Sequence, residues 1–122
     1  MQIKVEKLML AKDSLNKLLS QELPVTTAFR LSKLAKQVIE ELKTVEDNRI
    51  KLIKKYQEEP KEGEKESNIR VAPENAAAFN QDFSELLNIE IGLDFEPISI
   101  GEISDVKLTA IDLINLDVFV KN

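Results

Sequence analysis

Apolar residues near the start of the chain recur every three or four positions, which is the spacing of one face of a helix. This pattern predicts a helix over Val5–Leu23. Residues 1–5 also alternate between polar and apolar, so a short strand is the alternative for the first few positions. Pro24 disfavours helical geometry in the residue before it and therefore marks a break.

A longer helix is predicted from Pro24 to Tyr56, because proline suits the first turn of a helix. Its apolar residues follow a heptad seam with one charged interruption: Leu31, Ala35, Val38, Leu42, Val45, Arg49, Leu52 and Tyr56. Other apolar residues widen this stripe and predict packing against more than one neighbour: Leu34, Ile39, Ile50 and Ile53. At about 1.5 Å per residue, the helix is about 50 Å long, against a diameter of about 30 Å for a compact domain of this size. Part of it must therefore project, pair with another helix or bind a partner.

Residues 57–68 contain no hydrophobic residue but include a proline and a glycine, which predicts a flexible charged loop. A return helix is predicted over Pro73–Ile89, where apolar residues again follow helical spacing. The two helices then form an antiparallel hairpin with the loop at its tip. In this hairpin, Arg49 is expected to pair with an acidic residue of the return helix, such as Glu74 or Asp82.

Beyond residue 88 the period changes to two, which is typical of a half-buried strand. The apolar members of the alternation are Ile89, Ile91, Leu93 and Phe95. Pro97 ends this strand or places it at a sheet edge, and an alternating stretch continues to Gly101. Two short strands on either side of Pro97 are expected to form a small ribbon, and the N-terminal residues are a candidate third strand.

The last predicted element is a helix that starts near Thr109. Thr109 and Asp112 resemble a capping box in which aspartate replaces the usual glutamate. From Ile111 to Val120 the segment is apolar nearly all round, so it is either buried or part of an interface. The interface is favoured, because 122 residues leave little core to surround it.

The chain is therefore predicted to be a single domain over residues 1–122. Its fold class is mainly α with minor β. The predicted architecture is a long antiparallel helical hairpin with an N-terminal helix, a short β-ribbon and a C-terminal helix.

Composition changes this picture mainly by excluding chemistry. Cysteine is absent, which excludes disulfides and cysteine nucleophiles, and histidine is absent, which removes the commonest general base and metal ligand. The three glycines lie far apart, so no phosphate-binding loop exists, and neither a cofactor nor a metal site is predicted. No apolar run approaches the roughly 20 residues that span a bilayer, and the N-terminus lacks the apolar region of a signal peptide. A cytoplasmic protein with no membrane segment is expected.

The net charge of −5 is unevenly distributed. Residues 1–56 carry a net charge of +5, residues 57–68 of −3 and residues 69–122 of −7. The favoured interpretation is that the basic and acidic halves attract each other, within the fold or across a homo-oligomer. The alternative is a basic surface for an anionic partner. Nucleic acid is a less favoured partner, because acidic residues interrupt the lysines of the long helix.

Four stretches of the sequence carry a family resemblance: "LPVTTAFRLSKLAKQVIEEL", "RIKLIKKY", "VAPENAAAFNQDFSELLNIEIGLDFEPISIGEI" and "LTAIDLINLDVFV". Together they cover most of the chain, and they resemble a group of small, uncharacterised proteins encoded by tailed bacteriophages and prophages. The resemblance implies a phage origin, a location in the bacterial host cytoplasm or in the virion, and a role in virion assembly or in handling the host. It brings no catalytic residues.

The sequence predicts a non-enzymatic interaction or assembly protein, expected to be a homo-oligomer and to bind itself, a phage protein or a host protein. The candidate interface combines the seam of the long helix with the apolar end of the chain: Leu31, Val38, Leu42, Val45, Arg49, Leu52, Ile111, Ile114, Val118 and Phe119. The alternative is a host-directed regulator or inhibitor that imitates nucleic acid with its acidic half or binds nucleic acid weakly.

Overall fold

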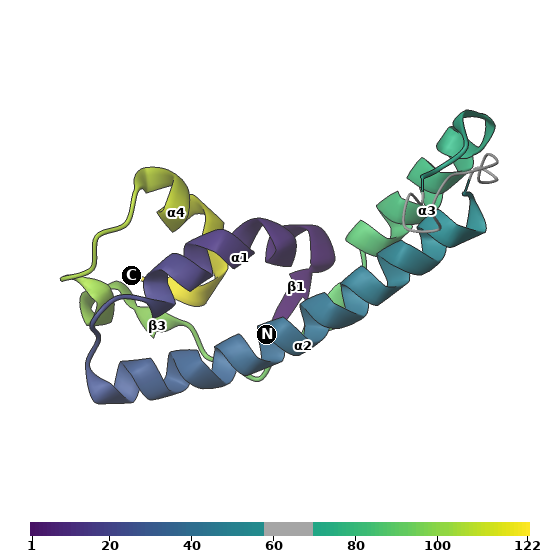
Figure 1. Cartoon of the computed structure of the whole chain (residues 1–122). Helices are drawn as coiled ribbons and strands as arrows, with labels where there is room; N and C mark the ends of the chain where they lie inside the picture. The colour runs from purple at the N-terminus through teal and green to yellow at the C-terminus, as the bar shows by residue number, and fades with distance from the viewer. Residues whose placement is uncertain (58–69) are drawn as a thin grey trace.

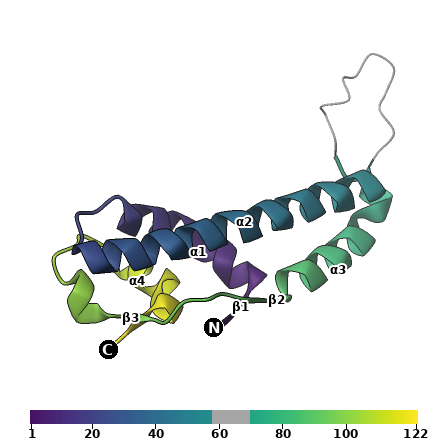
Figure 2. The ribbon, with the colours of Figure 1, turned by 90° about the horizontal axis from the view of Figure 1, so that it is seen from below.

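The long helix α2 (Val25–Lys55) runs along one side of the molecule in the computed structural model of the chain (Figures 1 and 2). The structure describes residues 1–57 and 70–122, so the predicted loop over residues 57–68 lies outside them apart from Gln57. With 31 residues, α2 extends over about 46 Å. It begins directly after Pro24 and ends at Lys55, with Tyr56 as its C-cap, which confirms the predicted long helix.

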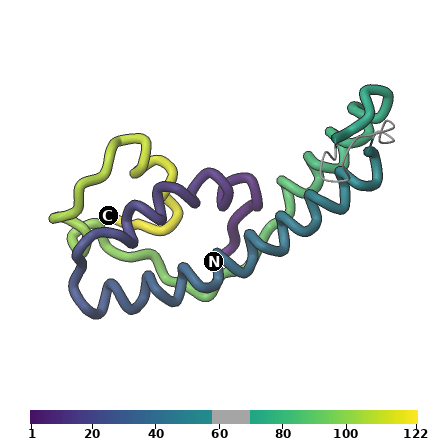
Figure 3. Tube along the Cα trace, in the orientation of Figure 1, coloured from purple at the N-terminus to yellow at the C-terminus, as the bar shows by residue number. Residues whose placement is uncertain are grey.

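The N-terminal helix α1 (Val5–Leu19) packs against the first half of α2. Its buried residues share one face and recur at helical spacing: Val5, Leu8, Ala11, Ser14, Leu15 and Leu18. The helix ends four residues before the predicted Leu23. The carbonyl of Lys17 accepts hydrogen bonds from the Ser20 hydroxyl (2.7 Å) and the Gln21 side-chain amide (3.4 Å), which replace the bonds of a further helical turn. Figure 3 traces the non-helical connection from there into α2.

The two halves of the extended segment after residue 88 pair with the two ends of the chain. Strand β1 (Gln2–Lys4) lies antiparallel to β2 (Glu90–Gly92), with Ile3 opposite Ile91. Strand β3 (Ile98–Ser99) instead runs parallel to β4 (Val120–Lys121). The N-terminal strand alternative is thus confirmed. The predicted ribbon between the stretches that flank Pro97 is wrong.

Side chains of α2 explain why the segment around Pro97 does not fold back into a ribbon. The Gln37 amide donates to the carbonyl of Asp94 (3.0 Å), and its oxygen accepts from the Asp94 backbone N–H (2.8 Å). The Arg30 guanidinium donates to the carbonyl of Glu96 (2.7 Å). These bonds use the backbone groups that a ribbon partner would need, so the segment stays extended along α2.

The return helix α3 (Ala76–Leu87) packs antiparallel on the second half of α2, which confirms the helical hairpin (Figure 2). It is shorter than predicted, because Pro73–Asn75 form a 3₁₀ turn, η1, and the helix ends before Ile89. Tyr56 anchors the far end: its ring meets Phe79 edge-on at 6.5 Å, and its hydroxyl donates to Asp82 at 2.6 Å. The second half of α2 and α3 therefore project as an arm (Figure 1).

The C-terminal helix α4 (Ala110–Asn115) begins after Thr109 as predicted but ends five residues before Val120. A 3₁₀ turn, η3 (Asp117–Phe119), and then β4 complete the chain. A 3₁₀ turn has three residues per turn, so Leu116 and Phe119 point to the same side, and both are fully buried. Burial of these two side chains explains why the helix does not continue. Another 3₁₀ turn, η2 (Ile100–Ile103), follows β3.

The core lies between α1, the first half of α2 and the segment from Ile91 to Phe119. Its buried hydrophobic side chains are aliphatic except for Phe95 and Phe119, whose rings meet edge-on at 6.0 Å. The mainly α fold with minor β structure agrees with the prediction.

Candidate interaction surfaces

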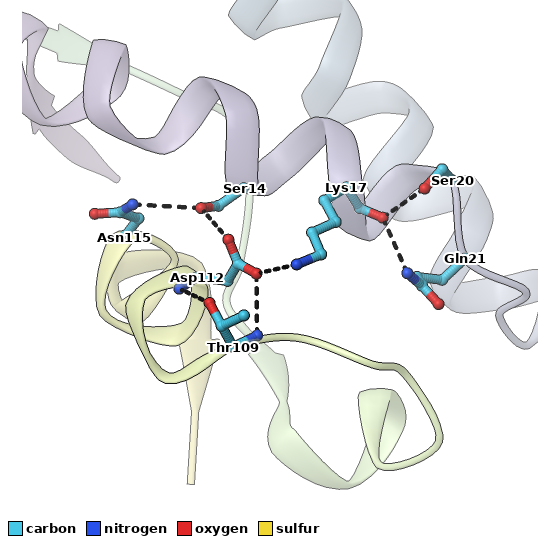
Figure 4. A network of polar contacts seen from close by, with 7 residues as sticks. All are labelled: Ser14, Lys17, Ser20, Gln21, Thr109, Asp112 and Asn115. Atoms are coloured by element: carbon cyan, nitrogen blue, oxygen red, sulfur yellow. Dashed lines mark hydrogen bonds and ion pairs between the residues drawn. The ribbon is translucent and has the colours of Figure 1, made fainter.

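A polar network built around Asp112 fixes α4 on α1 (Figure 4). The Asp112 carboxylate accepts hydrogen bonds from the Ser14 hydroxyl and from the Lys17 ammonium, both at 2.8 Å. The Asn115 amide donates to the Ser14 hydroxyl oxygen at 3.3 Å. Ser14 is buried, so its hydroxyl needs these partners. The network orients α4 on α1 through one face of the short helix.

The same carboxylate caps the first turn of α4. Its oxygen accepts from the backbone N–H of Thr109 (3.0 Å), and the Thr109 hydroxyl accepts from the backbone N–H of Asp112 (3.1 Å). The predicted capping box is therefore present. The Lys17 ammonium, the Thr109 N–H and the Ser14 hydroxyl together hold the pKa of Asp112 well below its usual range. Asp112 is thus a structural anion whose carboxylate is engaged in holding α4 on α1.

Helix α4 also carries apolar side chains that nothing in the described chain covers. Ile111 and Ile114 are 69% and 67% exposed and stand three positions apart, so they are neighbours on the helix surface. We call Ile111 and Ile114 the α4 face.

The seam predicted as the candidate interface faces inward instead. Leu31, Val38 and Val45 are buried in the core, so their assignment to a docking surface is corrected. Phe119 is corrected for the same reason, since it is fully buried against Phe95.

The other predicted interface residues remain partly or largely accessible. Leu42 and Val118 are half-buried against the core, and Leu52 is half-buried between α2 and α3. Only Ile111 and Ile114 among the predicted interface residues are strongly exposed.

Arg49 does not pair with the return helix. Its guanidinium makes two hydrogen bonds to Glu46, one turn earlier on α2, at 2.6 and 2.9 Å. Asp82, one of the two expected partners, binds the Tyr56 hydroxyl (2.6 Å) and Lys55 (3.5 Å). The predicted pairing is therefore wrong. Residues three positions apart on a helix are already neighbours, so this local pair forms with little loss of conformational entropy.

A second apolar stripe lies on the solvent side of α2, and only Ile39 and Ile50 of it were predicted, as flanks of the seam. It consists of Val25, Phe29, Ile39 and Ile50, which are 86%, 62%, 67% and 37% exposed. We call these four residues the outer face of α2. The spacing of 25, 29, 39 and 50 is compatible with a heptad in its own right, and this was the signal available in the sequence.

Two grooves lie between α2 and its neighbouring helices. One, of about 410 Å³, runs between α1 and α2 and is lined mainly by apolar carbon, with Leu15, Ile39 and Leu42 among its residues. The other, of about 600 Å³, lies between α2 and α3, where Lys51 and Lys55 oppose Asp82 and Glu85. Neither groove contains a buried polar side chain that lacks a partner.

Among the residues that the structure describes, four ion pairs connect residues distant in sequence: Lys7–Asp117 and Lys17–Asp112 at 2.8 Å, and Arg30–Glu102 and Lys55–Asp82 at 3.5 Å. Each joins a cation of residues 1–56 to a carboxylate of residues 69–122. The interpretation that the two halves attract each other within the fold is therefore confirmed for these pairs.

Glu102 ties the turn η2 to the start of α2. Its carboxylate accepts from the backbone N–H of Ser99 (2.7 Å) and from the buried Thr27 hydroxyl (3.2 Å). These bonds, with the nearby Arg30, hold the pKa of Glu102 below its ordinary value. The carboxylate is thus engaged in fixing the fold.

Within residues 1–57 and 70–122, no three side chains of the metal-ligating types gather into a possible metal site. No helix in the same ranges has the length and apolar character to cross a membrane. Comparison with protein-family models, with curated proteins and with solved structures gives no match to this chain.

Proposed function

We propose that this protein is a non-enzymatic interaction protein that binds a partner protein through the α4 face. The observation that carries the proposal is the exposure of Ile111 and Ile114 on a helix that the Asp112 network fixes on α1. Two neighbouring side chains of this size expose apolar surface to water, which is unfavourable. A binding partner that covers them removes this surface from water and so gains free energy of association.

The rigidity of the α4 face supports a role in binding. Five hydrogen bonds connect Ser14, Lys17, Thr109, Asp112 and Asn115, so the isoleucines are held in place before a partner arrives. Preorganisation of this kind reduces the entropy lost on association. The partner expected from this chemistry is a protein that presents an apolar surface of its own.

The setting of this interaction is proposed from the sequence resemblance alone. A protein of tailed-phage type would act in the cytoplasm of the bacterial host or in the virion, so virion proteins and host proteins are the partners to search first. The alternative of an acidic nucleic-acid mimic has less support. Four carboxylates of the acidic half already form ion pairs within the chain: Asp82, Glu102, Asp112 and Asp117.

A paired capture experiment tests the proposal. The full chain and the double variant Ile111→Gln/Ile114→Gln are immobilised and exposed to extract from phage-infected bacteria, and the retained proteins are identified by mass spectrometry. The matched control is Val25→Gln/Phe29→Gln, which removes two equally exposed apolar side chains from α2. All four substituted side chains are mainly exposed, so circular dichroism should show unchanged folding.

The expected result is one identified protein retained by the wild type and the control but lost by the α4 variant. Titration calorimetry with that purified protein should then give a dissociation constant at least about tenfold weaker for the α4 variant, since central apolar contacts contribute about 1–2 kcal/mol each. Equal affinity of that protein for the wild type and the α4 variant would contradict the proposal.

A further inference from the structure

The outer face of α2 is a series of four exposed apolar residues along most of the helix, with polar residues between them. At 100° per residue, its four apolar side chains fall within a sector of about 80°. The stripe extends from Val25 to Ile50, over about 38 Å. Helices α1 and α4 lie on the other side of α2, and no described helix or strand lies outside it (Figures 1 and 2).

We propose that the outer face of α2 binds the same face of a second copy of this chain, with the two helices antiparallel. This inference is independent of the α4 face. The choice of occupant rests on charge complementarity between the two halves of the stripe. Lys33 and Lys36 border its N-terminal half, and Glu40, Glu46 and Asp47 border its C-terminal half. Lys43, Arg49 and Lys51 are cations in the second half, and Arg49 pairs with Glu46 on the same helix, so Glu40 and Asp47 are the carboxylates left to complement the lysines.

Orientation follows from this charge pattern. A parallel second copy would place the lysines of one N-terminal half against those of the other, and the carboxylates likewise. An antiparallel copy places the basic half of each helix against the acidic half of its neighbour, which lowers the energy of association. A two-fold axis produces both contacts at once, because the same patch serves both copies.

The heptad spacing of the stripe also defines a register. With the two-fold axis at the level of Gln37 and Val38, Val25 of one copy lies opposite Ile50 of the second copy. Lys36 then lies opposite Ile39, with its methylene stem on the isoleucine and its ammonium in solvent. Lys33 of each copy lies beside Glu40 of the other, which forms two equivalent ion pairs at the edge of the contact.

The resulting contact is modest, and this sets the expected affinity. Its apolar layers come from Val25, Ile39 and Ile50, and polar residues separate them. An interface with so few apolar anchors belongs at the small end of stable protein contacts, so we expect a dissociation constant of about 1–100 µM.

Sedimentation equilibrium of the full chain tests the dimer. The wild type should dimerise within the range of about 1–500 µM, and Ile39→Lys should weaken dimerisation at least about tenfold. Ile111→Lys, on the α4 face, is the matched control and should leave the dimer intact. Because both isoleucines are about two-thirds exposed, neither substitution should affect folding.

Charge reversal tests the register. Lys33→Glu and Glu40→Lys should each weaken the dimer, and the double variant should restore it, because the pair then has inverted but matching charges. The two positions are seven residues apart on α2, so a contact within one helix does not explain rescue. Absence of rescue would overturn the register.

Disulfide cross-linking tests the orientation, and the absence of native cysteine makes it clean. A mixture of Val25→Cys and Ile50→Cys proteins should form a mixed cross-linked dimer on mild oxidation, whereas each variant alone should form little. Cross-linking of Val25→Cys with itself as the main product would overturn the antiparallel arrangement. A wild-type chain that stays monomeric throughout the concentration range would overturn the dimer itself. Partner capture by the Ile111→Gln/Ile114→Gln variant tests the α4 face alone, whereas the dimer is tested by sedimentation and cross-linking.

Discussion

Replacement of Phe119 by alanine tests whether this side chain stabilises the core or belongs to an exposed interface. The Phe119 side chain is fully buried, and its ring meets that of Phe95 edge-on at a centroid distance of 6.0 Å. Arg30 lies over the ring of Phe95, with its guanidinium carbon 5.7 Å from the ring centroid. Loss of the Phe119 ring therefore opens a cavity beneath the β3–β4 pair and removes one side of this cluster.

The magnitude follows from the burial. Truncation of a buried phenylalanine to alanine costs about 3–5 kcal/mol, and the lost aromatic pair is part of that cost. The comparison variant is Ile114→Ala, whose side chain is only one-third buried. Full burial of isoleucine stabilises by about 1.5–3 kcal/mol, so one third of it is worth less than about 1 kcal/mol, and the higher helix propensity of alanine offsets part of that.

Urea unfolding followed by far-UV circular dichroism measures both variants. With an m value of about 1.5 kcal/mol/M, a loss of about 4 kcal/mol lowers the Phe119→Ala midpoint by about 2.5 M, whereas the Ile114→Ala midpoint moves by less than about 0.7 M. If Phe119→Ala is too unstable to measure, Phe119→Leu retains most of the volume and should cost about 1.5 kcal/mol. A loss of less than about 1 kcal/mol in the free energy of unfolding for Phe119→Ala would refute the assignment of Phe119 to the core. A loss for Ile114→Ala that is larger than the loss for Phe119→Ala would refute it as well.

Three further predictions concern the polar contacts. The pKa of Asp112 is lower in the folded state than in the unfolded state, so its ionised form stabilises the fold above about pH 4, and that stability is lost as the pH falls below this value. Urea midpoints measured from pH 6 to pH 3 should therefore fall more steeply for the wild type than for Asp112→Asn. Parallel curves for the two proteins would contradict this prediction. Thr109→Ala removes the hydroxyl that caps α4 and should cost about 1 kcal/mol in the same urea assay at neutral pH, whereas Thr109→Ser should cost little. Arg49→Ala should lower the free energy of unfolding by less than about 0.5 kcal/mol, since its pair with Glu46 is exposed and screened by solvent; a cost above about 1.5 kcal/mol would indicate the cross-hairpin contact that the structure lacks.

Several elements were predictable because their causes are local. Pro24 and the long apolar periodicity define α2 within one residue at each end, and the Thr109–Asp112 capping box defines the start of α4. The alternation after residue 88 correctly predicts burial of Ile91, Leu93 and Phe95, but not of Ile89, which is 52% exposed. These features depend on backbone geometry and on neighbours a few residues away, which the sequence displays directly.

Strand pairing was not predictable in the same way. The period of two identifies extended backbone but not its partner, because pairing depends on which distant segment supplies free N–H and C=O groups. Here the Arg30 and Gln37 side chains occupy backbone groups of residues 94–96, and the two chain ends supply the partners for β2 and β3.

By itself, the sequence determined that α2 carries apolar residues on a wide stripe and that the chain ends in an apolar segment, because periodicity and hydrophobicity are properties of the residues. Only the tertiary structure decided which part of each faces solvent. α1 packs over Leu31, Val38 and Val45 and leaves Ile39 and Ile50 outside, while η3 turns Phe119 inward and leaves Ile111 and Ile114 exposed. A heptad pattern states that a helix has an apolar face. Which face is buried depends on where the other helices dock, and that contact is made between residues far apart in the chain.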